Sequence, residues 1–478
     1  MSPRPHPFSL LLATPCLLAA ATVLPAQEPA SKAAPQVLVV TTSVPRARAA
    51  FDAGASDLVN GRFERADQQY RQALALDPSA GIVRAAYAAW ALGLPQAERL
   101  RELDRAVADA ARASTPELLA AAALREWVRG DRAAWSTLIR ATRALVPDDP
   151  YLASIDAGFA LMAGKPVEAT GIAQEYLARN PNAAPLYNLL GYGLFRSGHQ
   201  ADGLAAMEHY VALLPDEPNP HDSYGELLLA AGRLEDAERE YRRAVELDPG
   251  FTNSYRGLAR VAQARHDYRA ARSPLEAVVA QAPDLEARAD AQRALAFNAV
   301  FMGDMDAAHD QLMAAAVNAE KGGLAVHAAF SHGFLATLEA AAGHARAARE
   351  QLGARDAAPA WNRAVGSAIA HGALGQAAEV DKDLASLEQA QGTPGMAPDA
   401  LPLVRLVDRA VRGDVAGARG ELAGMKAPNF RLLGQTFVLR AARRTKDAAA
   451  TAAAEAELNG YQAVDGNSAF AHRLVGLP

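Results

Sequence analysis

Apolar residues recur along most of the chain with the spacing of amphipathic α-helices, and this pattern itself repeats as a larger unit. The segments 184–215 and 218–249 each contain two apolar runs of helix length, separated by a short polar turn. Three positions of the first segment recur 34 residues later in the second: Gly191 as Gly225, Gly198 as Gly232, and Pro215 as Pro249. Two short antiparallel helices that stack into a helical solenoid repeat with this period. The pattern therefore predicts consecutive helical pairs rather than an ordinary bundle.

The recurring residues have positions that suit such a pair. Gly191 and Gly225 lie within the first helix, where glycine costs about 1 kcal/mol relative to alanine. That cost is explained if the second helix approaches too closely for a Cβ atom, and Ala237 is the small residue expected to face it. The second recurring glycine ends the first helix in a left-handed conformation. The recurring proline ends the second helix, because proline cannot continue one.

The same turn can be followed through the rest of the chain. Glycine occupies it at further positions: Gly61, Gly130, Gly164, Gly303, Gly343, Gly375 and Gly413. His266 and Lys446 occupy it in two units that have lost the glycine. In several units an aspartate follows directly, as Asp131 does, where its side chain can cap the second helix. These positions predict an all-α protein, an α-α superhelical solenoid of about 10–12 helical pairs.

In this register the chain resembles the tetratricopeptide repeat family. The motif at 41–45 and the block at 218–224 are similar to those of secreted bacterial members with no assigned activity. The resemblance implies that the first helix of each pair lines a concave groove and that its polar positions contact a ligand. Three consecutive units would each present two such residues: Asn188 and Tyr192, Asp222 and Glu226, Arg256 and Arg260. The two residues of each unit are four apart and so lie on one helical face.

Two interpretations of these six residues stay open. Some members of the family use basic residues at such positions to hold the C-terminal carboxylate of a partner, and Arg256 and Arg260 fit that use. Asp222 and Glu226 do not, because they would repel an anionic terminus. In the other interpretation, the acidic pair and the arginine pair neutralise each other across adjacent helices.

The pattern also divides the chain into segments. In order, they are a signal peptide over 1–26, a leader over 27–44, N-terminal repeats with one degenerate unit over 45–150, well-formed repeats over 151–285, degenerate repeats over 286–390, a linker over 391–398, and C-terminal repeats with a terminal cap over 399–478. We expect the unit between 78 and 116 to be the degenerate one. We also expect an irregular tail after Gly460.

The first segment has the pattern of a secretory signal, with Arg4, an apolar run and a cleavage site after Ala26. The apolar run is short for a membrane span, and Pro15 directly before Cys16 makes a poor lipidation site. We therefore expect an exported protein, periplasmic or secreted, with no lipid anchor and no transmembrane span after cleavage.

Composition and charge narrow the choice of function. Hydrophobic residues make up 50% of the chain but aromatic residues only 6%, which suits many thin helix–helix seams better than one thick core. The net charge is −6 and no Lys/Arg-rich block is present, so we do not expect nucleic acid binding. No phosphate-binding loop or nucleophile elbow is found. His327 and His332 are five residues apart, which places them about 140° apart around a helix.

The sequence thus favours a non-catalytic, exported repeat protein that binds a protein or peptide partner on its concave surface. We expect it to act as an adaptor or in assembly, with no metal and no cofactor. A self-assembling envelope scaffold, and hence a homo-oligomer, is the alternative. A more remote alternative is an enzyme with a site in the C-terminal half, near His327, His332 and His371.

Overall fold

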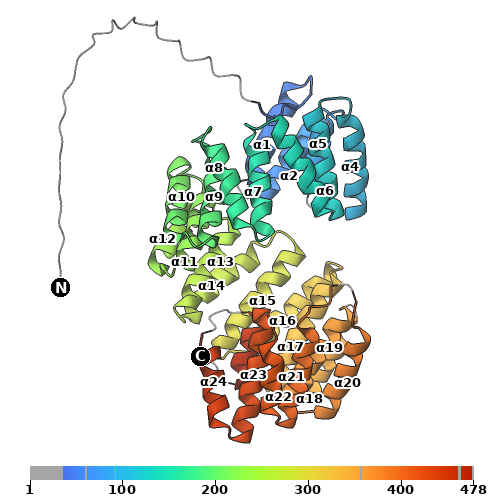
Figure 1. Cartoon of the computed structure of the whole chain (residues 1–478), viewed down its shortest axis with the longest axis vertical. Coiled ribbons are helices and arrows are strands. Elements are labelled where there is room, and N and C mark those ends of the chain that lie inside the picture. The colour runs from blue at the N-terminus through green and yellow to red at the C-terminus, as the bar shows by residue number, and fades with distance from the viewer. Residues whose placement is uncertain are drawn as a thin grey trace, which may run out of the picture.

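The computed structural model describes residues 36–59, 62–91, 93–355, 358–393, 395–460 and 465–475. Over these ranges all regular structure is α-helical, with 25 helices and no β-strand. Helices α1 to α24 form twelve consecutive pairs, and the two helices of each pair pack against each other. The predicted all-α superhelical solenoid is confirmed (Figure 1).

The first helices of the pairs carry odd numbers and the second helices even numbers. The first helices are α1 Pro45–Val59, α3 Gly81–Trp90, α5 Thr115–Arg129, α7 Pro150–Met162, α9 Ala184–Arg196, α11 Pro218–Ala230, α13 Thr252–Ala264, α15 Leu285–Phe301, α17 Ala325–Ala341, α19 Ala360–Ala373, α21 Ala400–Arg412 and α23 Pro428–Thr445. The second helices are α2 Phe63–Leu76, α4 Gln96–Ala110, α6 Arg132–Leu145, α8 Pro166–Leu177, α10 Gln200–Leu213, α12 Leu234–Leu247, α14 Tyr268–Ala280, α16 Met305–Lys321, α18 Ala345–Gly353, α20 Ala377–Gln389, α22 Val415–Ala423 and α24 Ala448–Leu458. A last helix, α25, spans Gly466–Val475.

The turn inside each pair has the backbone conformation that the sequence predicts. Gly198 has a φ of +90° and Gly232 a φ of +75°, both in the left-handed region. His266 and Lys446 adopt the same conformation without a glycine, with φ of 57° and 62°. Gly61 lies outside the described residues. The register of the repeats therefore follows from a local backbone requirement, which glycine meets without strain.

The close helix contact predicted at the mid-helix glycines is present. A Cβ atom on Gly191 would lie 2.9 Å from the side chain of Met207 on α10, and one on Gly225 would lie 3.1 Å from the ring of Tyr241 on α12. Ala237 is fully buried in the second of these seams. Each seam has its own small cluster of buried apolar residues, as expected when a repeat contacts only its neighbours.

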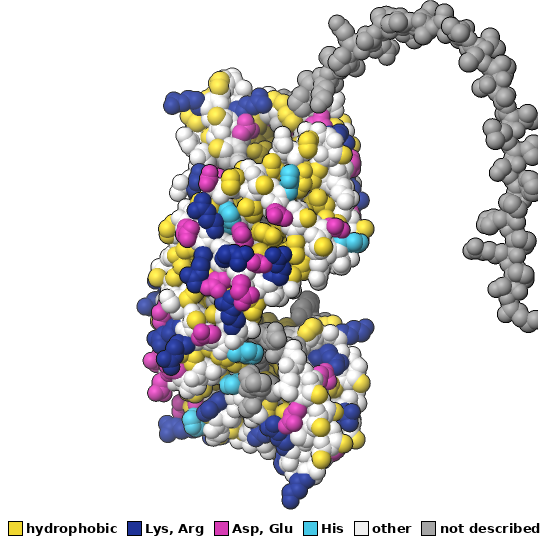
Figure 2. Space-filling view, turned by 90° about the vertical axis from the view of Figure 1, so that its left-hand side faces the viewer, with side chains coloured by type: hydrophobic (Ala, Val, Ile, Leu, Met, Phe, Trp, Pro, Cys, Tyr) yellow, Lys and Arg dark blue, Asp and Glu magenta, His cyan; other side chains and the backbone are white. Residues whose placement is uncertain are grey.

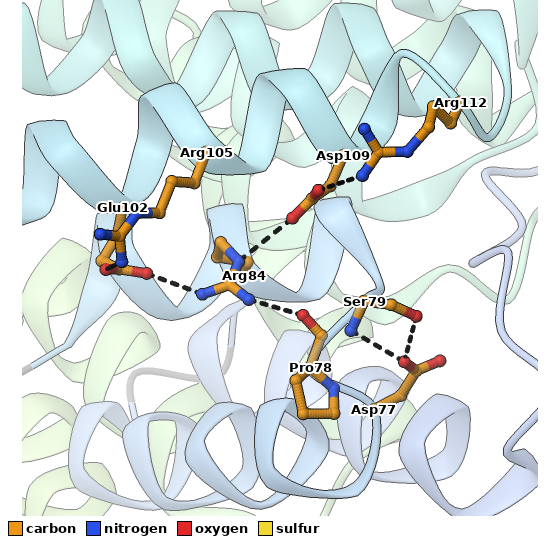
Figure 3. Close-up of polar contacts among 8 residues, drawn as sticks. All are labelled: Asp77, Pro78, Ser79, Arg84, Glu102, Arg105, Asp109 and Arg112. Carbon is orange, nitrogen blue, oxygen red and sulfur yellow. Dashed lines mark hydrogen bonds and ion pairs between the residues drawn. The ribbon is translucent and has the colours of Figure 1, made fainter.

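The unit that the sequence leaves degenerate folds as an ordinary helical pair, α3 with α4. Its turn contains Gly93 with a φ of +72°, a position that the sequence pattern misses. Arg84 on α3 braces the pair (Figure 3). Its guanidinium donates to Glu102 of α4 at 2.8 Å and to the carbonyl of Pro78 at 2.5 Å, and it lies 3.5 Å from Asp109. An arginine fork thus joins the turn before α3 to two points along α4.

Both ends of the array contact helices that lie further away along the chain than their immediate neighbours. In the N-terminal part α1 contacts α7 (Figure 1). In the C-terminal part α25 packs against α15, α17 and α23. Helix α25 corrects the expectation of an irregular tail after Gly460. Phe470 and Ala471 are buried in the same core as α23, so the tail is ordered by tertiary contacts that a sequence pattern does not reveal.

The other predicted segments fall as follows. The signal peptide predicted over 1–26 lies outside the described residues. Residues 391–398 lie between α20 and α21, which contact each other directly. Among the helices that the structure describes, none combines the length and apolar character needed to cross a bilayer.

Candidate partner-binding face

The six residues predicted to contact a partner lie on three neighbouring first helices. Asn188 and Tyr192 are on α9, Asp222 and Glu226 on α11, and Arg256 and Arg260 on α13. Helix α9 contacts α11, and α11 contacts α13, so the 34-residue period places equivalent residues side by side. The result is two rows across the three helices: Asn188, Asp222 and Arg256 in one, and Tyr192, Glu226 and Arg260 in the other.

The acidic residues of these rows are held by hydroxyl groups. The Tyr192 hydroxyl donates to Glu226 Oε2 at 2.6 Å, and the Ser254 hydroxyl of α13 donates to Asp222 Oδ1 at 2.7 Å. Burial raises the pKa of Asp222 to about 6, and the negative charge of Glu226 adds to this, while Ser254 and Arg260 oppose it. Asp222 is therefore a carboxyl group that loses most of its charge in mildly acidic conditions.

The arginines of the rows are not neutralised by ion pairing. Within the described part of the chain, no carboxylate oxygen lies within 4.0 Å of the guanidinium of Arg256 or Arg260. Arg260 is exposed, whereas Arg256 is half-buried and burial lowers its pKa. Asn188 Oδ1 is also buried without a hydrogen-bond partner among the described residues. The face of α9, α11 and α13 thus presents two cations without an ion-pair partner among the described residues, while the amide oxygen of Asn188 is enclosed beneath it.

The outer face, around α10 and α12, differs in that charged side chains on it are paired. Figure 2 views the molecule from the side of α10 and α12, and it shows Lys and Arg side chains mixed with Asp and Glu side chains. Two acidic residues of α12 each pair with two arginines: Asp236 with Arg233 and Arg239, and Glu238 with Arg242 and Arg265. Basic residues of this surface are therefore already matched by acidic neighbours.

Residues 36–44 form a second feature that the sequence analysis missed. They run without regular structure along the edge where α5 and α7 begin. The backbone N–H of Leu38 donates to Asp149 at 3.0 Å, and the N–H and hydroxyl of Thr41 donate to Glu117. Leu38 packs against the buried clusters of α3, α5 and α7. The continuous apolar run from 37 to 40 was the available signal, and it is too short to indicate which helices it packs against.

The histidines that would support an enzyme lie apart. His327 Nε2 lies 3.3 Å from Glu286, His332 Nδ1 lies 2.7 Å from Gln351, and His371 Nδ1 lies 2.7 Å from Asp383. Each is thus engaged with a different polar partner. Among the residues that the structure describes, no three His, Cys, Asp or Glu side chains are grouped as metal ligands would be.

Known proteins were compared with the chain. Residues 218–261 match the tetratricopeptide repeat family. The TPR repeat-containing thioredoxin TTL4 of Arabidopsis thaliana is 33% identical over 103 residues, which cover 22% of this chain and 14% of that protein. The chain thus aligns with only about a seventh of the length of that relative.

Solved structures with similar helical arrays cover parts of the chain. A tetratricopeptide repeat protein of Parabacteroides merdae aligns with 61% of this chain and 98% of its own, at a TM-score of 0.38 and 12% identity. A thermophilic tetratricopeptide repeat protein of Thermus thermophilus aligns with 37% of this chain and 97% of its own, at a TM-score of 0.34 and 18% identity.

The fold defines the class of the molecule as a helical-repeat solenoid. Its twelve helical pairs, its turn glycines and its fully buried Ala237 follow one repeating register. The family match over 218–261 lies inside that register, so the chain contains a tetratricopeptide repeat there, within an array of similar helical pairs.

Proposed function

We propose that the chain is a non-catalytic adaptor that binds a protein or peptide partner on the inner face of α9, α11 and α13. Proteins of this repeat class typically serve as scaffolds for protein–protein interaction, because stacked repeats create an extended concave surface. The observation that carries the proposal is the pair Arg256 and Arg260, which lies on that face without a carboxylate partner.

The chemistry of the face favours a partner segment that carries carboxylates. Arginine forks bind carboxylates through paired, charge-assisted hydrogen bonds. Asp222 and Glu226 already accept hydrogen bonds from Ser254 and Tyr192, so their lone pairs are partly used. We infer that an acidic side chain or C-terminal carboxylate of the partner lies over α13, where Arg260 is exposed.

The N-terminal segment supports the idea that this array can hold an extended chain. Residues 36–44 lie against the solenoid in an extended course, with backbone N–H groups donated to carboxylates of the helix starts. A foreign peptide would be recognised by the same means, with main-chain bonds giving affinity and side-chain pockets giving specificity.

The test is a charge reversal on the inner face with a matched reversal on the outer face. We expect Arg256→Glu with Arg260→Glu to weaken binding of a partner captured by crosslinking, and to remove most of the salt dependence of binding. The control is Arg239→Glu with Arg242→Glu, which makes the same change in charge on α12, where both side chains are exposed. Equal affinities for the two double variants, measured by titration with the purified partner, would refute the assignment of the face.

Self-assembly is a second candidate, and one surface favours it. Met162 at the end of α7 and Val167 at the start of α8 are 74% and 73% exposed. They flank a surface cavity lined by Trp127, Trp135 and Phe159. Light scattering of the purified chain separates the adaptor from the scaffold. A scaffold must associate at micromolar concentration, and Met162→Lys must prevent that association.

Export is part of the proposal and rests on the sequence alone. The segment 1–26 has the order of a secretory signal, namely a basic residue, an apolar run and a cleavage site. Fusion of this segment to a reporter that is active only after export tests it. The name of the Arabidopsis relative includes thioredoxin, but this chain has a single cysteine, and we propose no dithiol activity for it.

A further inference from the structure

The inner side of the C-terminal part encloses a cavity of about 270 Å³. Its walls come from helices that are distant in sequence: α17, α19, α23 and α25. Five aromatic side chains line it: Phe330, Phe334, Trp361, Phe430 and Phe470. Phe330 is 38% exposed, so the cavity is open to solvent beside it. This volume is near the lower end of the range for small-molecule sites, which are mostly apolar with a few polar groups.

One cation is buried in the wall of this cavity. Arg355, between α18 and α19, is 3% exposed. It donates from Nη1 to the carbonyl of Arg363, and from Nη2 to the carbonyl and the side-chain oxygen of Asn362. A guanidinium has five N–H groups. These three bonds leave one N–H of Nη1 unused, and Nε has no partner in the part of the chain that the structure describes.

The charge of Arg355 has no acidic partner among the residues that the structure describes, which do not include its neighbour Asp356. Among the described residues, no carboxylate oxygen lies within 4.0 Å of its guanidinium. Within this described part of the chain, the charge that acts on its pKa is that of Arg363, which has the same sign. Burial, with a smaller contribution from Arg363, lowers the pKa of Arg355 to about 10, so the group is still protonated at neutral pH. Burying an uncompensated ion is unfavourable, and an anion bound beside it would remove that cost.

The sequence leaves room for this guanidinium. A Cβ atom on Gly366 of α19 would lie 2.3 Å from Nη1, and one on Gly333 of α17 would lie 3.1 Å from Nε. Both glycines are inside helices, where glycine is unfavourable. Both also line the cavity, as do Asn362 and Asn429, which add amide donors.

A purely structural role explains only part of this arrangement. Arg355 does tie the connection after α18 to the first turn of α19 through the carbonyls of Asn362 and Arg363. A neutral donor would make the same bonds without burying a charge. The tether therefore accounts for the hydrogen bonds of Arg355 but not for the placement of a cation, with an N–H of Nη1 unused, in the wall of a cavity that holds aromatic side chains.

We propose that this cavity binds a small organic monocarboxylate, with the carboxylate at Arg355 and Asn362 and an aromatic or short acyl body between Phe334, Trp361 and Phe470. The unused N–H of Nη1 can donate to one carboxylate oxygen, and the side-chain amide of Asn362 can donate to the other. The aromatic walls remove the body of the ligand from water. This site is separate from the inner face of α9, α11 and α13, and it does not depend on partner binding there.

The experiment uses the full chain and compares phenylpropanoate with phenylpropanamide, which has the same shape without the charge. We expect calorimetry to detect binding of the carboxylate and about tenfold weaker or no binding of the amide. Trp361 is the tryptophan of this cavity, so Trp361→Phe should abolish the ligand-induced change in fluorescence.

Two variants locate the binding site. Arg355→Met keeps most of the side-chain volume and should weaken phenylpropanoate binding by about tenfold or more. Arg346→Met is the matched control, because Arg346 lies nearby on α18 and its side chain is 90% exposed. This variant should bind phenylpropanoate as tightly as the wild type does. If Arg355→Met does not fold, Phe330→Ala serves instead, since Phe330 is partly exposed and its loss removes one wall of the cavity.

Several results would overturn the proposal. One is failure of the wild type to bind phenylpropanoate, and another is equally tight binding of phenylpropanamide. A folded Arg355→Met variant that binds phenylpropanoate as the wild type does would have the same consequence. Binding only of peptides with a free C-terminal carboxylate would also overturn it. A loss of thermal stability in Arg355→Met, with no carboxylate binding by the wild type, would show that Arg355 is a tether alone.

Discussion

Replacement of Asp222 by asparagine tests the electrostatics of the inner face most directly. Burial raises the pKa of Asp222 from 3.8 to about 6. Below pH 3.8 the group is neutral in both folded and unfolded chains. Between pH 3.8 and 6 the unfolded chain releases the proton while the folded chain keeps it, so the free energy of unfolding falls as the pH rises. Above pH 6 the group is charged in both states, so the free energy of unfolding falls no further from this cause.

The size of this loss follows from the shift. One pKa unit corresponds to about 1.4 kcal/mol, so a shift of roughly two units is worth at most about 3 kcal/mol. Asp222→Asn removes the ionisation, and the amide oxygen can still accept the hydrogen bond from Ser254. We therefore expect Asp222→Asn to have a higher free energy of unfolding than the wild type at pH 7.5. The difference between variant and wild type should be about 2 kcal/mol larger at pH 7.5 than at pH 4.5.

The assay is urea unfolding at the two pH values, followed by helical circular dichroism. Asp216→Asn is the control, because Asp216 precedes the same helix and its side chain is 88% exposed. It should change the free energy of unfolding by less than about 0.5 kcal/mol at either pH. The reasoning fails if the two variants behave alike at pH 7.5, or if Asp222→Asn destabilises the chain equally at both pH values.

Three further predictions concern the repeat architecture, each checked by the midpoint of thermal or urea unfolding. Lys446→Gly should stabilise the chain by about 0.5–1 kcal/mol, because Lys446 has a φ of 62° where glycine is free of strain. Gly232→Ala at the equivalent turn, where an added methyl meets no atom within 4 Å, should instead cost about 1 kcal/mol; a stable Gly232→Ala would contradict both. Gly257→Ala should destabilise by about 1–3 kcal/mol, since its Cβ atom would lie 2.3 Å from the ring of Tyr241. Ala237→Glu should cost about 2 kcal/mol or more by burying a charge in a closed seam, and an unchanged midpoint would show the seam to be wrongly placed.

The turns of the array were predictable because they depend on local backbone chemistry. A left-handed residue is required wherever the first helix ends, and glycine marks it at most units. The same spacing located His266 and Lys446 at this conformation although neither is a glycine. The predicted aspartate cap is also present, since the Asp131 side chain accepts from the backbone N–H of Ala134.

The candidate site could be located but its bonding could not be predicted. The 34-residue period places Tyr192 beside Glu226 and Asp222 beside the helix that carries Ser254, because equivalent positions of stacked repeats are neighbours. Whether Arg256 would meet these carboxylates depends on side-chain directions, which the period does not specify. The sequence therefore left neutralisation and partner binding open, and the structure shows arginines without ion pairs.

The order of the helices, their pairing and the faces that they bury were set by the sequence, since each rests on a requirement of the residue itself or of its neighbours three or four positions away. Helix α25, the course of residues 36–44 and the cavity around Arg355 were decided by the tertiary structure. Each of these brings together segments from distant repeats, and the curvature that does so is the sum of many small rotations between neighbouring pairs. No local pattern in the chain encodes that sum, so the contacts it creates appear only in the folded molecule.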